Sequence, residues 1–375
     1  MSGVSDMLSV PDGIEVVQTR EDADRLASPP LLILEAVEEF LDGAGVGGLG
    51  SGPLRWARIG DGQSNVTYRV ERGDEVFVLR RGPRPPLPKS THDMVREARI
   101  QQLVAAEGVP VPQILAVCDD ASVLGVPFYV MNFLSGMTIA DEVPALLGSA
   151  EDRAATSAAV VDTLVQLHRV PVTAGGLATF GRPEGYLRRQ VERFGGLWSL
   201  NTTRDLPEVA RIGRWLGEHV PQSQTATVIH GDYRTDNLLF AADAPARVLA
   251  ILDWEMATVG DPLADLGYLT ATYSEPGSTP TPLELTGVTR QPGYLSRTEL
   301  VDRYREQMPL DLGALNWYQT LALWKASIFC EAIYTRWLNG ERPDDTSFGP
   351  SLADGIPRLL EGARQFAGDA ADIDF

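Results

Sequence analysis

The sequence predicts an α+β protein of two lobes, a small lobe of strands with one helix and a larger, mainly helical lobe. Three observations predict this fold class. The chain has 375 residues, too many for one compact core at roughly 100–200 residues per domain. Short apolar runs fill residues 45–133 around a single helical pattern, and helical spacing dominates from residue 150 onward. We therefore expect an N-terminal leader with a short helix over 1–44, a small lobe over 45–133 and a helical lobe over 134–375.

The elements of the small lobe follow from apolar spacing, turn residues and helix-capping residues. Residues 30–41 (PLLILEAVEEFL) have the apolar spacing of a short helix. Residues 91–107 predict the prominent helix of the lobe, which begins at the capping-type residue Thr91 and stops at Gly108. The expected strands are two within 56–70, joined by a glycine turn, and one each at 75–80, 111–117 and 128–133.

The larger lobe is predicted from repeated helical spacing. The expected helices are 150–169, 186–194, 206–219, 296–307 and 315–338. Two short apolar segments interrupt them, at 227–230 and 248–252. Residues 276–293 (PGSTPTPLELTGVTRQPG) are rich in proline, glycine and threonine and predict an exposed loop.

Charge and composition exclude several classes of protein. The net charge is −19, which argues against nucleic-acid and anionic-membrane partners, because those require a basic surface. The two cysteines have no metal-type spacing, and no signal peptide is recognisable, so we expect a cytoplasmic protein without disulfides. Residues 121–140 carry no charge over the length of a membrane span, but glycine and proline interrupt them, which favours a buried strand that leads into a loop.

One segment places many polar residues between two apolar runs. Residues 228–240 read VIHGDYRTDNLLF, and Asp253 follows at the end of another short strand, AILD. Phosphoryl transfer requires a carboxylate that orients the attacking hydroxyl, together with carboxylate and amide oxygens that hold Mg²⁺. Asp232, Asn237 five positions later and Asp253 are side chains of these types. The apolar flanks predict buried segments that hold the polar residues between them in a fixed position.

The residues HGDYRTDN, followed by ILDWEMATVGDPLADLG, resemble the aminoglycoside phosphotransferase and choline kinase-like superfamily, relatives of the protein kinases. The resemblance implies a protein-kinase-like bilobal fold and a transferase that uses ATP and Mg²⁺ to phosphorylate a hydroxyl of a small molecule. It implies that Asp232 is the catalytic base and that Asn237 and Asp253 are magnesium ligands. It also implies that His230 braces the loop and that Asp265 holds the loop by hydrogen bonds. The alternative is a nucleotide-binding pseudokinase or regulatory protein without turnover.

The same resemblance implies a nucleotide site in the small lobe. Its phosphate-covering loop lies in residues 59–68 (IGDGQSNVTY), and the segment 129–134 offers main-chain groups to adenine. The residues that the resemblance assigns to nucleotide binding are Gly60, Gly62, Gln63, Ser64, Asn65, Val78, Arg80, Glu97, Met131, Asn132, Phe133 and Leu134.

One of these residues departs from the kinase pattern. Most kinases have a lysine on the third strand, where this chain has Arg80. An arginine also binds phosphate, through two parallel hydrogen bonds. We expect Arg80 to pair with Glu97, and the rival cation is Lys89, in the proline-rich stretch.

The acceptor site is the least determined part of the sequence. Residues 186–198 resemble a segment of the acyl-CoA dehydrogenase-associated kinases, a branch whose acceptor is thought to be a hydroxyacyl-CoA. The candidate acceptor contacts are Tyr186, Arg189, Trp198 and Glu255, although for Trp198 ordinary core packing is an alternative. An aminoglycoside, a choline-like amine and a sugar remain open as acceptors, as do ATP against GTP and a monomer against a homodimer.

Two other enzyme classes fit the sequence less well. A protein kinase would have Asp-Phe-Gly and Ala-Pro-Glu, whereas this chain has Asp253-Trp254-Glu255 and no Ala-Pro-Glu. A hydrolase with two metals would need more histidines than the four present and acidic pairs near the motif.

Overall fold

The computed structural model describes residues 9–10, 13–47, 52–60, 65–84, 92–140, 142, 144–202, 204–243, 246–278, 280–284, 286–341 and 345–368. The chain divides into two compact units, Met1–Leu134 and Ser135–Phe375. Each unit has buried apolar residues of its own.

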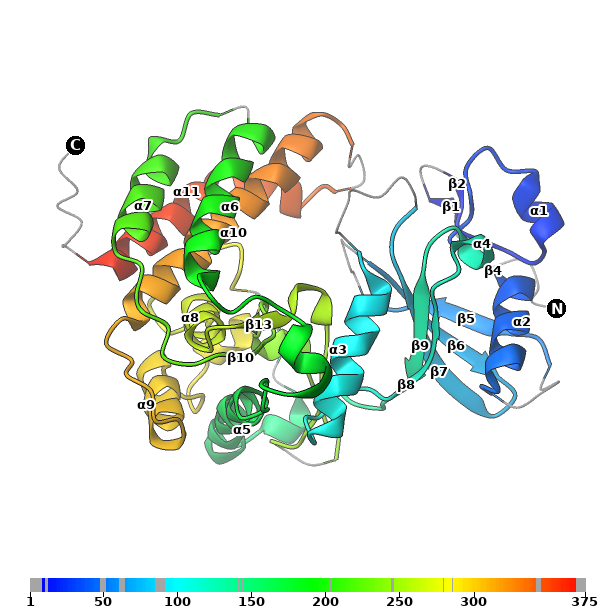
Figure 1. Ribbon diagram of the computed structural model, residues 1–375, viewed down its shortest axis with the longest axis horizontal. Coiled ribbons are helices and arrows are strands. Elements are labelled where there is room, and N and C mark those ends of the chain that lie inside the picture. The colour runs from blue at the N-terminus through cyan, green and yellow to red at the C-terminus, as the bar shows by residue number, and fades with distance from the viewer. Residues whose placement is uncertain are drawn as a thin grey trace. The chain divides into compact units, whose positions relative to one another are not determined.

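The first unit is built on a five-stranded antiparallel sheet with the strand order β5-β6-β7-β9-β8 (Figure 1). The strands are β5 (Arg55–Arg58), β6 (Val66–Arg72), β7 (Glu75–Arg81), β8 (Ile114–Cys118) and β9 (Phe128–Asn132). Successive side chains of a strand point to opposite faces. Accordingly Phe77 and Leu79 join one apolar cluster, with helix α2 (Leu34–Ala44), and Val78 joins another, with helix α3 (Met94–Ala106). The two helices therefore cover opposite faces of the sheet.

The leader is part of this unit's core. Its elements are β1 (Ser9–Val10), β2 (Gly13–Ile14), β3 (Val16–Val17), α1 (Arg20–Asp24) and β4 (Leu32–Ile33), followed by α2. Val16, Leu32 and Leu41 are almost fully buried in the cluster beneath the sheet. The buried Glu15 accepts a hydrogen bond from the Tyr68 hydroxyl at 2.6 Å. The helix expected over 30–41 is thus a short strand followed by a helix.

The start of the prominent helix differs from the prediction. Helix α3 begins at Met94, and its N-cap is Asp93, whose side chain accepts a hydrogen bond from the Arg96 backbone N–H at 2.9 Å. The predicted cap, Thr91, lies outside the described residues. An aspartate directly before the first apolar residue is as good a cap as a threonine, so the choice between them required the structure.

The second unit is mainly helical. Its helices are α5 (Ala150–His168), α6 (Tyr186–Asn201), α7 (Pro207–Glu218), α8 (Leu263–Thr272), α9 (Arg297–Gln307), α10 (Leu315–Leu338) and α11 (Phe348–Ala367). Its short strands are β10 (Thr227–Ile229), β11 (Leu238–Phe240), β12 (Val248–Ile251) and β13 (Thr258–Gly260). The short helices of the chain are α4 (Ala121–Leu124) in the first unit and the 3₁₀ turns η1 (Ala145–Leu147), η2 (Gly175–Thr179), η3 (Thr235–Asn237), η4 (Trp254–Met256) and η5 (Gly287–Arg290).

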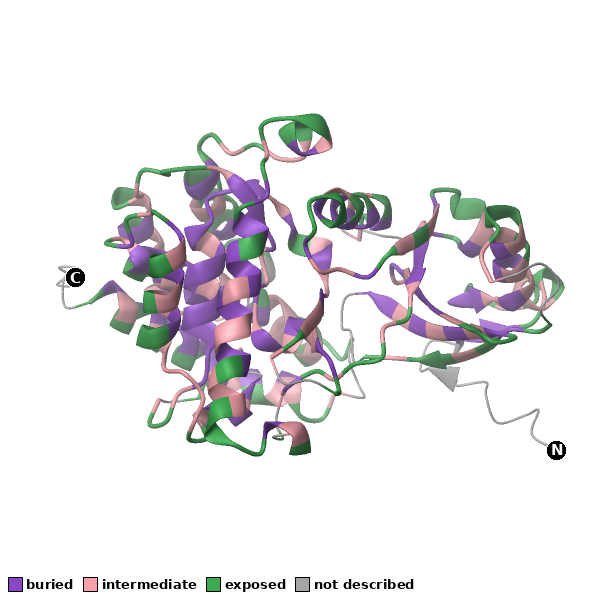
Figure 2. Cartoon of the chain, turned by 90° about the horizontal axis from the view of Figure 1, so that it is seen from below, coloured by how far each residue is buried: buried purple, intermediate pink, exposed green. Residues whose placement is uncertain are grey.

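Helix α10 is the centre of the second unit. It contacts α6, α7, α8 and α11, and the buried residues gather in the interior of this helical unit (Figure 2). Trp317 and Trp324, on α10, are each at most 2% exposed. A helix that is apolar on every side is stable only when other helices surround it. The five helices expected from the sequence are present, and α6 is longer than expected.

Helices α8 and α11 were not predicted, because both contain residues that disfavour a helix. Gly267 lies within α8, and a Cβ atom added there would lie 2.5 Å from the Tyr318 Cβ, so the glycine allows α8 to approach α10 closely. Pro357 lies inside α11. Tertiary packing outweighs local propensity in both helices.

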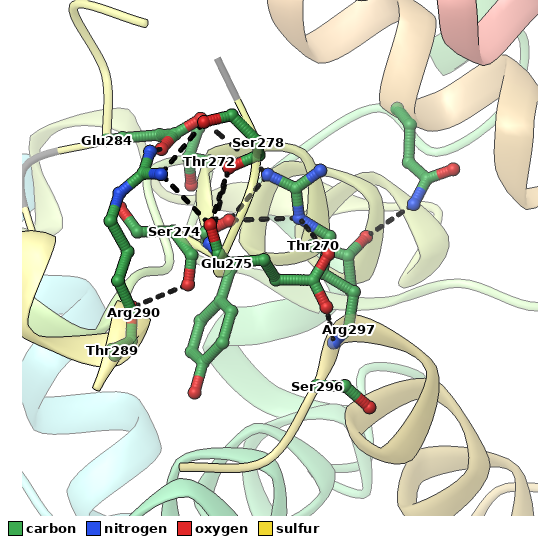
Figure 3. Close-up of polar contacts among 12 residues, drawn as sticks. Thr270, Thr272, Ser274, Glu275, Ser278, Glu284, Thr289, Arg290, Ser296 and Arg297 are labelled. Carbon is green, nitrogen blue, oxygen red and sulfur yellow. Dashed lines mark hydrogen bonds and ion pairs between the residues drawn. The ribbon is translucent and has the colours of Figure 1, made fainter. Parts of the chain in front are cut away.

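The prediction of an exposed loop over 276–293 is wrong for its central part. Val288 and Thr289 are buried, within η5. Figure 3 shows the polar contacts that hold this segment. The Arg290 Nη1 donates to the main-chain oxygens of Glu275 and Ser278, both at 2.9 Å. Arginine carries five donors in a fixed fork, so a segment of loop-like composition is held in place.

Glu284 joins the same cluster from within the segment. Its side chain is 3% exposed and forms ion pairs with Arg290 and, at 3.7 Å, with Arg297. The ends of the segment, near Pro276 and Gln291, are exposed as expected.

The uncharged stretch 121–140 contains the predicted buried strand, β9. It also contains the short helix α4, which was not predicted. Within the described ranges of the chain, no helix is both long and apolar enough to cross a membrane.

Candidate active site

Two β-ribbons of the second unit carry the polar motif. Strand β10 pairs with β13, and β11 pairs with β12, both antiparallel. Val228, Ile229 and Leu238 are fully buried. The polar residues 230–237 connect the two ribbons and therefore start and end on buried strands.

Asp265 fixes the first turn of this loop. Its Oδ2 accepts a hydrogen bond from the His230 backbone N–H at 2.7 Å, and its Oδ1 accepts one from the Gly231 N–H at 2.8 Å. Gly231 has φ +86°, and a Cβ atom there would lie 2.8 Å from the Met256 main-chain oxygen, so only glycine fits. The predicted hydrogen-bonding role of Asp265 is confirmed.

His230 braces the loop from beneath, as predicted. Its Nε2 lies 2.9 Å from the Leu252 main-chain oxygen, and its Nδ1 lies 3.3 Å from the Asp232 backbone nitrogen. A carbonyl can only accept and a backbone N–H can only donate, so in these two contacts Nε2 is the donor and Nδ1 the acceptor. The ring packs edge-on against Trp254, with centroids 5.0 Å apart.

Asp232 and Asn237 form one hydrogen-bonded unit. The Asn237 Nδ2 donates to the Asp232 main-chain oxygen at 2.8 Å and to Asp232 Oδ2 at 2.9 Å. Both contacts use the amide nitrogen. The Asn237 side-chain oxygen accepts neither of these hydrogen bonds, so it remains available to coordinate a cation.

Asp253 lies just after strand β12, which pairs with strand β11, and β11 begins directly after Asn237. The Leu252 N–H donates to the Asn237 main-chain oxygen at 2.8 Å, which brings the next residue to the same end of the ribbon. Asp253 has φ +62°, a left-handed conformation that costs a non-glycine residue roughly 1–2 kcal/mol. Strain of this kind gathers at functional sites.

Two further side chains that the sequence reading did not select lie near Asp232. The first is Tyr268, on α8. Burial raises the pKa of Tyr268 well above its ordinary value, and the Asp232 charge adds to the effect. The Arg234 Nη2 lies 3.5 Å from Asp232 Oδ2, and its Nε lies 3.2 Å from Asp236 Oδ1. Burial lowers the pKa of Arg234, but the charges of Asp232, Asp236 and Asp253 outweigh burial and raise it.

A hollow borders the loop 230–237 on the side of helix α8. It has a volume of about 210 Å³, including solvent at its mouth. Its walls are Arg234, Thr235, Asp236, Leu269, Thr272, Tyr273, Leu283 and Thr286. The segment that contains Glu284 therefore lies against the loop that carries Asp232.

In the first unit, the expected ion pair is present. The Arg80 Nε lies 2.8 Å from Glu97 Oε1, and both side chains are largely buried. The Tyr129 hydroxyl donates to the same Glu97 oxygen at 3.0 Å, and Gln101 Nε2 lies 3.1 Å from that hydroxyl. The pair is thus held on one side by helix α3 and on the other by strand β9.

The other predicted nucleotide contacts that the structure describes belong to the same unit as this pair. Val78 and Met131 are register partners on β7 and β9, in one apolar cluster with Ile59. Asn65 is buried and its Oδ1 lies 2.8 Å from His92 Nδ1. Gly60, Asn132, Phe133 and Leu134 are partly or largely exposed, whereas Gly62, Gln63 and Ser64, together with the rival cation Lys89, lie outside the described residues.

The candidate acceptor contacts differ in their surroundings. Tyr186 is buried, with its ring against Gly260. Arg189 donates to the main-chain oxygens of Arg182 and Glu184, so its guanidinium already stabilises a turn. Trp198 and Glu255 are partly exposed.

Comparisons with known proteins identify the family. The model of the phosphotransferase enzyme family matches residues 55–300. The chain belongs to this family.

Similar proteins fall into two groups. Mouse acyl-CoA dehydrogenase family member 10 is 33% identical over 347 residues, which are 91% of this chain and 31% of that protein. Chicken acyl-CoA dehydrogenase family member 11 is 33% identical over 79% of this chain and 38% of that protein. The chain thus spans about a third of the length of these relatives.

Among solved structures, a candidate aminoglycoside phosphotransferase of Ralstonia eutropha is 28% identical, with a TM-score of 0.72 over 88% of this chain and 98% of that one. A choline/ethanolamine kinase family protein of Mesorhizobium loti has a TM-score of 0.52 at 20% identity, over 84% of this chain and 94% of that one. The predicted α+β, protein-kinase-like fold and the predicted superfamily are confirmed.

In this phosphotransferase-family protein, sequence reasoning missed Arg234 and Tyr268, which lie near Asp232. Arg234 lies inside the motif and was available to inspection. Tyr268 lies three residues after Asp265, one helical turn along α8, so its position was recognisable only once α8 was known.

Proposed function

We propose that this chain transfers the γ-phosphoryl group of ATP to a hydroxyl group of a small molecule. The hydrogen-bonded unit of Asp232 and Asn237 is the observation that carries the proposal. Membership of the phosphotransferase family supports the reaction class.

Asp232 acts on the acceptor. Its carboxylate orients the attacking hydroxyl and takes its proton as the bond to phosphorus forms. Asn237 donates a hydrogen bond to Asp232, and we assign the nearby Tyr268 hydroxyl the role of a second donor. Two donors fix the carboxylate in one orientation. A fixed carboxylate loses less entropy when the hydroxyl binds, so orientation itself contributes to the rate.

Asn237 and Asp253 suit Mg²⁺, which takes oxygen ligands and usually binds through one or two protein groups plus substrate phosphates and water. When bound, Mg²⁺ neutralises charge on the β- and γ-phosphates.

Arg80 is proposed to bind the nucleotide phosphates, with Glu97 fixing its guanidinium. An arginine keeps its charge at every physiological pH. Val78 and Met131 are proposed to pack against adenine, and main-chain groups of Asn132 to Leu134 to hydrogen-bond to it.

The acceptor class is narrowed by the relatives. Several are called acyl-CoA dehydrogenase family members, which favours a hydroxylated acyl compound over an aminoglycoside, a sugar or a choline-like amine.

The proposal is tested by ADP release and phosphate transfer with MgATP and a panel of hydroxylated acceptors. We expect Asp232→Asn to lower kcat about 1,000-fold, within the range that proton-transfer groups contribute, and to leave MgATP binding within a few-fold. The matched control is Asp243→Asn, which makes the same chemical change at an 81%-exposed side chain and should leave kcat unchanged.

Turnover that survives Asp232→Asn would overturn the role of Asp232. Tight MgATP binding without turnover on any acceptor would instead support a nucleotide-binding protein that does not catalyse transfer.

A further inference from the structure

Lys325 is an unusual residue in this chain. It is one of only two lysines, and it lies on α10, the central and largely buried helix. Its side chain is only partly exposed. A lysine on such a helix loses much of its hydration, which costs free energy unless another group compensates.

The neighbours of Lys325 compensate its charge incompletely. Its Nζ donates to Gln190 Oε1 at 3.0 Å and lies 4.7 Å from the centre of the Phe194 ring. Gln190 and Phe194 are four residues apart on α6, on the same face. Throughout the part of the chain that the structure describes, no carboxylate lies within ion-pair distance of this ammonium group.

The charged groups around Lys325 define the local field. Burial is the main cause that lowers the pKa of Lys325, to about 8, and Arg193 on α6 lowers it further. Asp265 and Asp232 act in the opposite direction, so Lys325 lies within electrostatic range of the proposed catalytic base. Asp265 accepts hydrogen bonds from the loop through both its oxygens and forms no ion pair with the Lys325 ammonium group.

We propose that Lys325, assisted by Arg193, binds an anionic oxygen group of the acceptor and selects acceptors that carry one. The class is a hydroxylated compound with a carboxylate or phosphate group near the hydroxyl, with apolar atoms against Phe194. This inference rests on the proposed function and adds a specificity-determining residue to it.

The same geometry predicts that cationic acceptors bind poorly and that anionic ones are favoured. An acceptor with ammonium groups would approach two positive side chains without a described carboxylate to pair with them on this flank. Like-charge contact in a partly dehydrated site is strongly unfavourable. Specificity of this kind arises as much from repulsion of the wrong ligand as from attraction of the right one.

The test uses the full chain, MgATP and short hydroxyalkanoates with the hydroxyl at each position of the chain. Matched methyl esters, amino alcohols and hydroxyalkyl phosphates provide the neutral, cationic and phosphate arms. We expect wild type to favour the anionic acceptors. Lys325→Met should raise the KM for these acceptors about 10- to 100-fold, the range for a hydrogen bond to a charged group, with the KM for ATP unchanged.

Two controls separate charge from packing. Lys325→Arg keeps the charge and should retain the preference for anionic acceptors, with KM within several-fold of wild type. Arg364→Met removes an exposed cation of α11 and should change nothing. The methyl esters should respond to Lys325→Met by less than about threefold, because they offer no charge to lose.

The outcomes distinguish this inference from the proposed function. If esters and amino alcohols are phosphorylated as well as the acids, or if Lys325→Met lowers all rates equally, the role of Lys325 is overturned while the phosphotransferase proposal stands. A raised KM for ATP in Lys325→Met would move its role to the nucleotide and also overturn the inference. Calorimetric binding of the acids to Asp232→Asn, with and without Lys325→Met, reports on Lys325 without turnover, and equal affinities there would count against it.

Discussion

At the scale of single residues, the site depends on groups that hold Asp232 rather than on Asp232 alone. Asn237 donates to its carboxylate, and the Tyr268 hydroxyl of α8 lies close enough to be a second, proposed donor. Because burial raises the pKa of Tyr268, this phenol stays protonated and acts only as a donor. A donor of this kind restricts the carboxylate to the orientation that the acceptor needs.

Removal of the Tyr268 hydroxyl should therefore slow the chemical step. We expect Tyr268→Phe to lower kcat about 10- to 100-fold, because a hydrogen bond to a charged group contributes roughly 1.5–3 kcal/mol. The KM for ATP should stay within about twofold, since Tyr268 belongs to the acceptor side of the proposal. Steady-state kinetics with both substrates varied separates the two parameters. A raised KM for ATP with unchanged kcat would assign Tyr268 to the nucleotide instead.

The charge of Lys325 predicts a pH dependence that belongs to the acceptor. Its pKa is lowered from 10.5 to about 8, mainly by burial and then by Arg193, against Asp265 and Asp232. The ammonium form therefore exists below pH 8 and is lost above it. We expect the KM for carboxylate acceptors to rise as the pH passes through about 8, and to stay flat in Lys325→Arg, because arginine remains charged. A KM profile that is the same in both proteins would contradict this reading.

At the scale of elements, two adjacent arginines of strand β7 lie on opposite faces of the sheet and make different contacts. Arg80 pairs with Glu97 on α3. Arg81 points to the opposite face and is 1% exposed. There it donates to the main-chain oxygens of Leu31 and, at 3.2 Å, Leu124, so it holds the N-terminal segment against the sheet. Burial lowers the pKa of Arg81 to about 10, which still leaves it charged at neutral pH.

This division predicts opposite phenotypes for two neighbouring substitutions. Arg80→Met should weaken MgATP binding at least about 10-fold, since a charged contact with phosphate is lost, and should change stability by less than about 1 kcal/mol if Glu97 is neutralised by Glu97→Gln. Arg81→Met should cost about 3–5 kcal/mol, because several buried carbonyls lose their donor, and should leave MgATP affinity of the folded protein unchanged. Urea denaturation and calorimetric titration measure the two effects. If both variants lose stability and affinity together, the faces of β7 are not independent.

The segment 280–290 shows how a buried charge cluster holds an element that composition assigns to a loop. Burial raises the pKa of Glu284, although Arg290 and Arg297 oppose this by favouring its charged form. Removal of one cation would leave a buried carboxylate with incomplete compensation. We expect Arg290→Met to destabilise the protein by about 3–5 kcal/mol, and the double change with Glu284→Gln to recover part of that loss.

Limited proteolysis within 276–293 provides the local readout of this prediction. Cleavage should rise in Arg290→Met and fall again in the double variant. Because Leu283 and Thr286 border the hollow beside Asp236, the single variant should also lower kcat. Additive costs in the double variant would show that Glu284 and Arg290 are not coupled.

The helices and strands also show which parts of the fold can be predicted from the sequence. Strands and helices with regular apolar spacing, such as β7 and α10, were predicted within a few residues. Helices α8 and α11 were missed because Gly267 and Pro357 disfavour helix locally, and only contacts with α10 and with the rest of the unit stabilise them. Charge clusters such as that of Glu284 depend on residues that meet only in the folded chain. The local sequence pattern thus predicts a helix or strand that is stabilised by its own residues. It does not predict one that is stabilised mainly by tertiary contacts.

At the scale of the whole molecule, the candidate site also contains both residues that the sequence pattern indicated and residues that only the folded chain brings together. The roles of His230 and Asp265 in holding the loop followed from the motif, because order and spacing constrain both. Tyr268 and Lys325 come from helices α8 and α10, and no spacing rule connects them to Asp232. The acceptor side of the site is therefore the part that required the fold.

The net charge of the chain makes a prediction about that acceptor side. With a net charge of −19, the protein repels an anionic acceptor at long range, whereas Lys325 and Arg193 attract it only at short range. The screening length falls from about 30 Å at 0.01 M salt to about 10 Å at 0.1 M, so added salt weakens the repulsion more than the contact. At saturating MgATP we expect kcat/KM for carboxylate acceptors to rise about 3- to 10-fold over this range, and kcat/KM for the matched amino alcohols to fall. Lys325→Met should show the same salt dependence at a lower absolute kcat/KM, because the long-range field comes from the whole chain. If salt instead lowers kcat/KM for the carboxylates, the local cations and not the net charge dominate the approach of the acceptor.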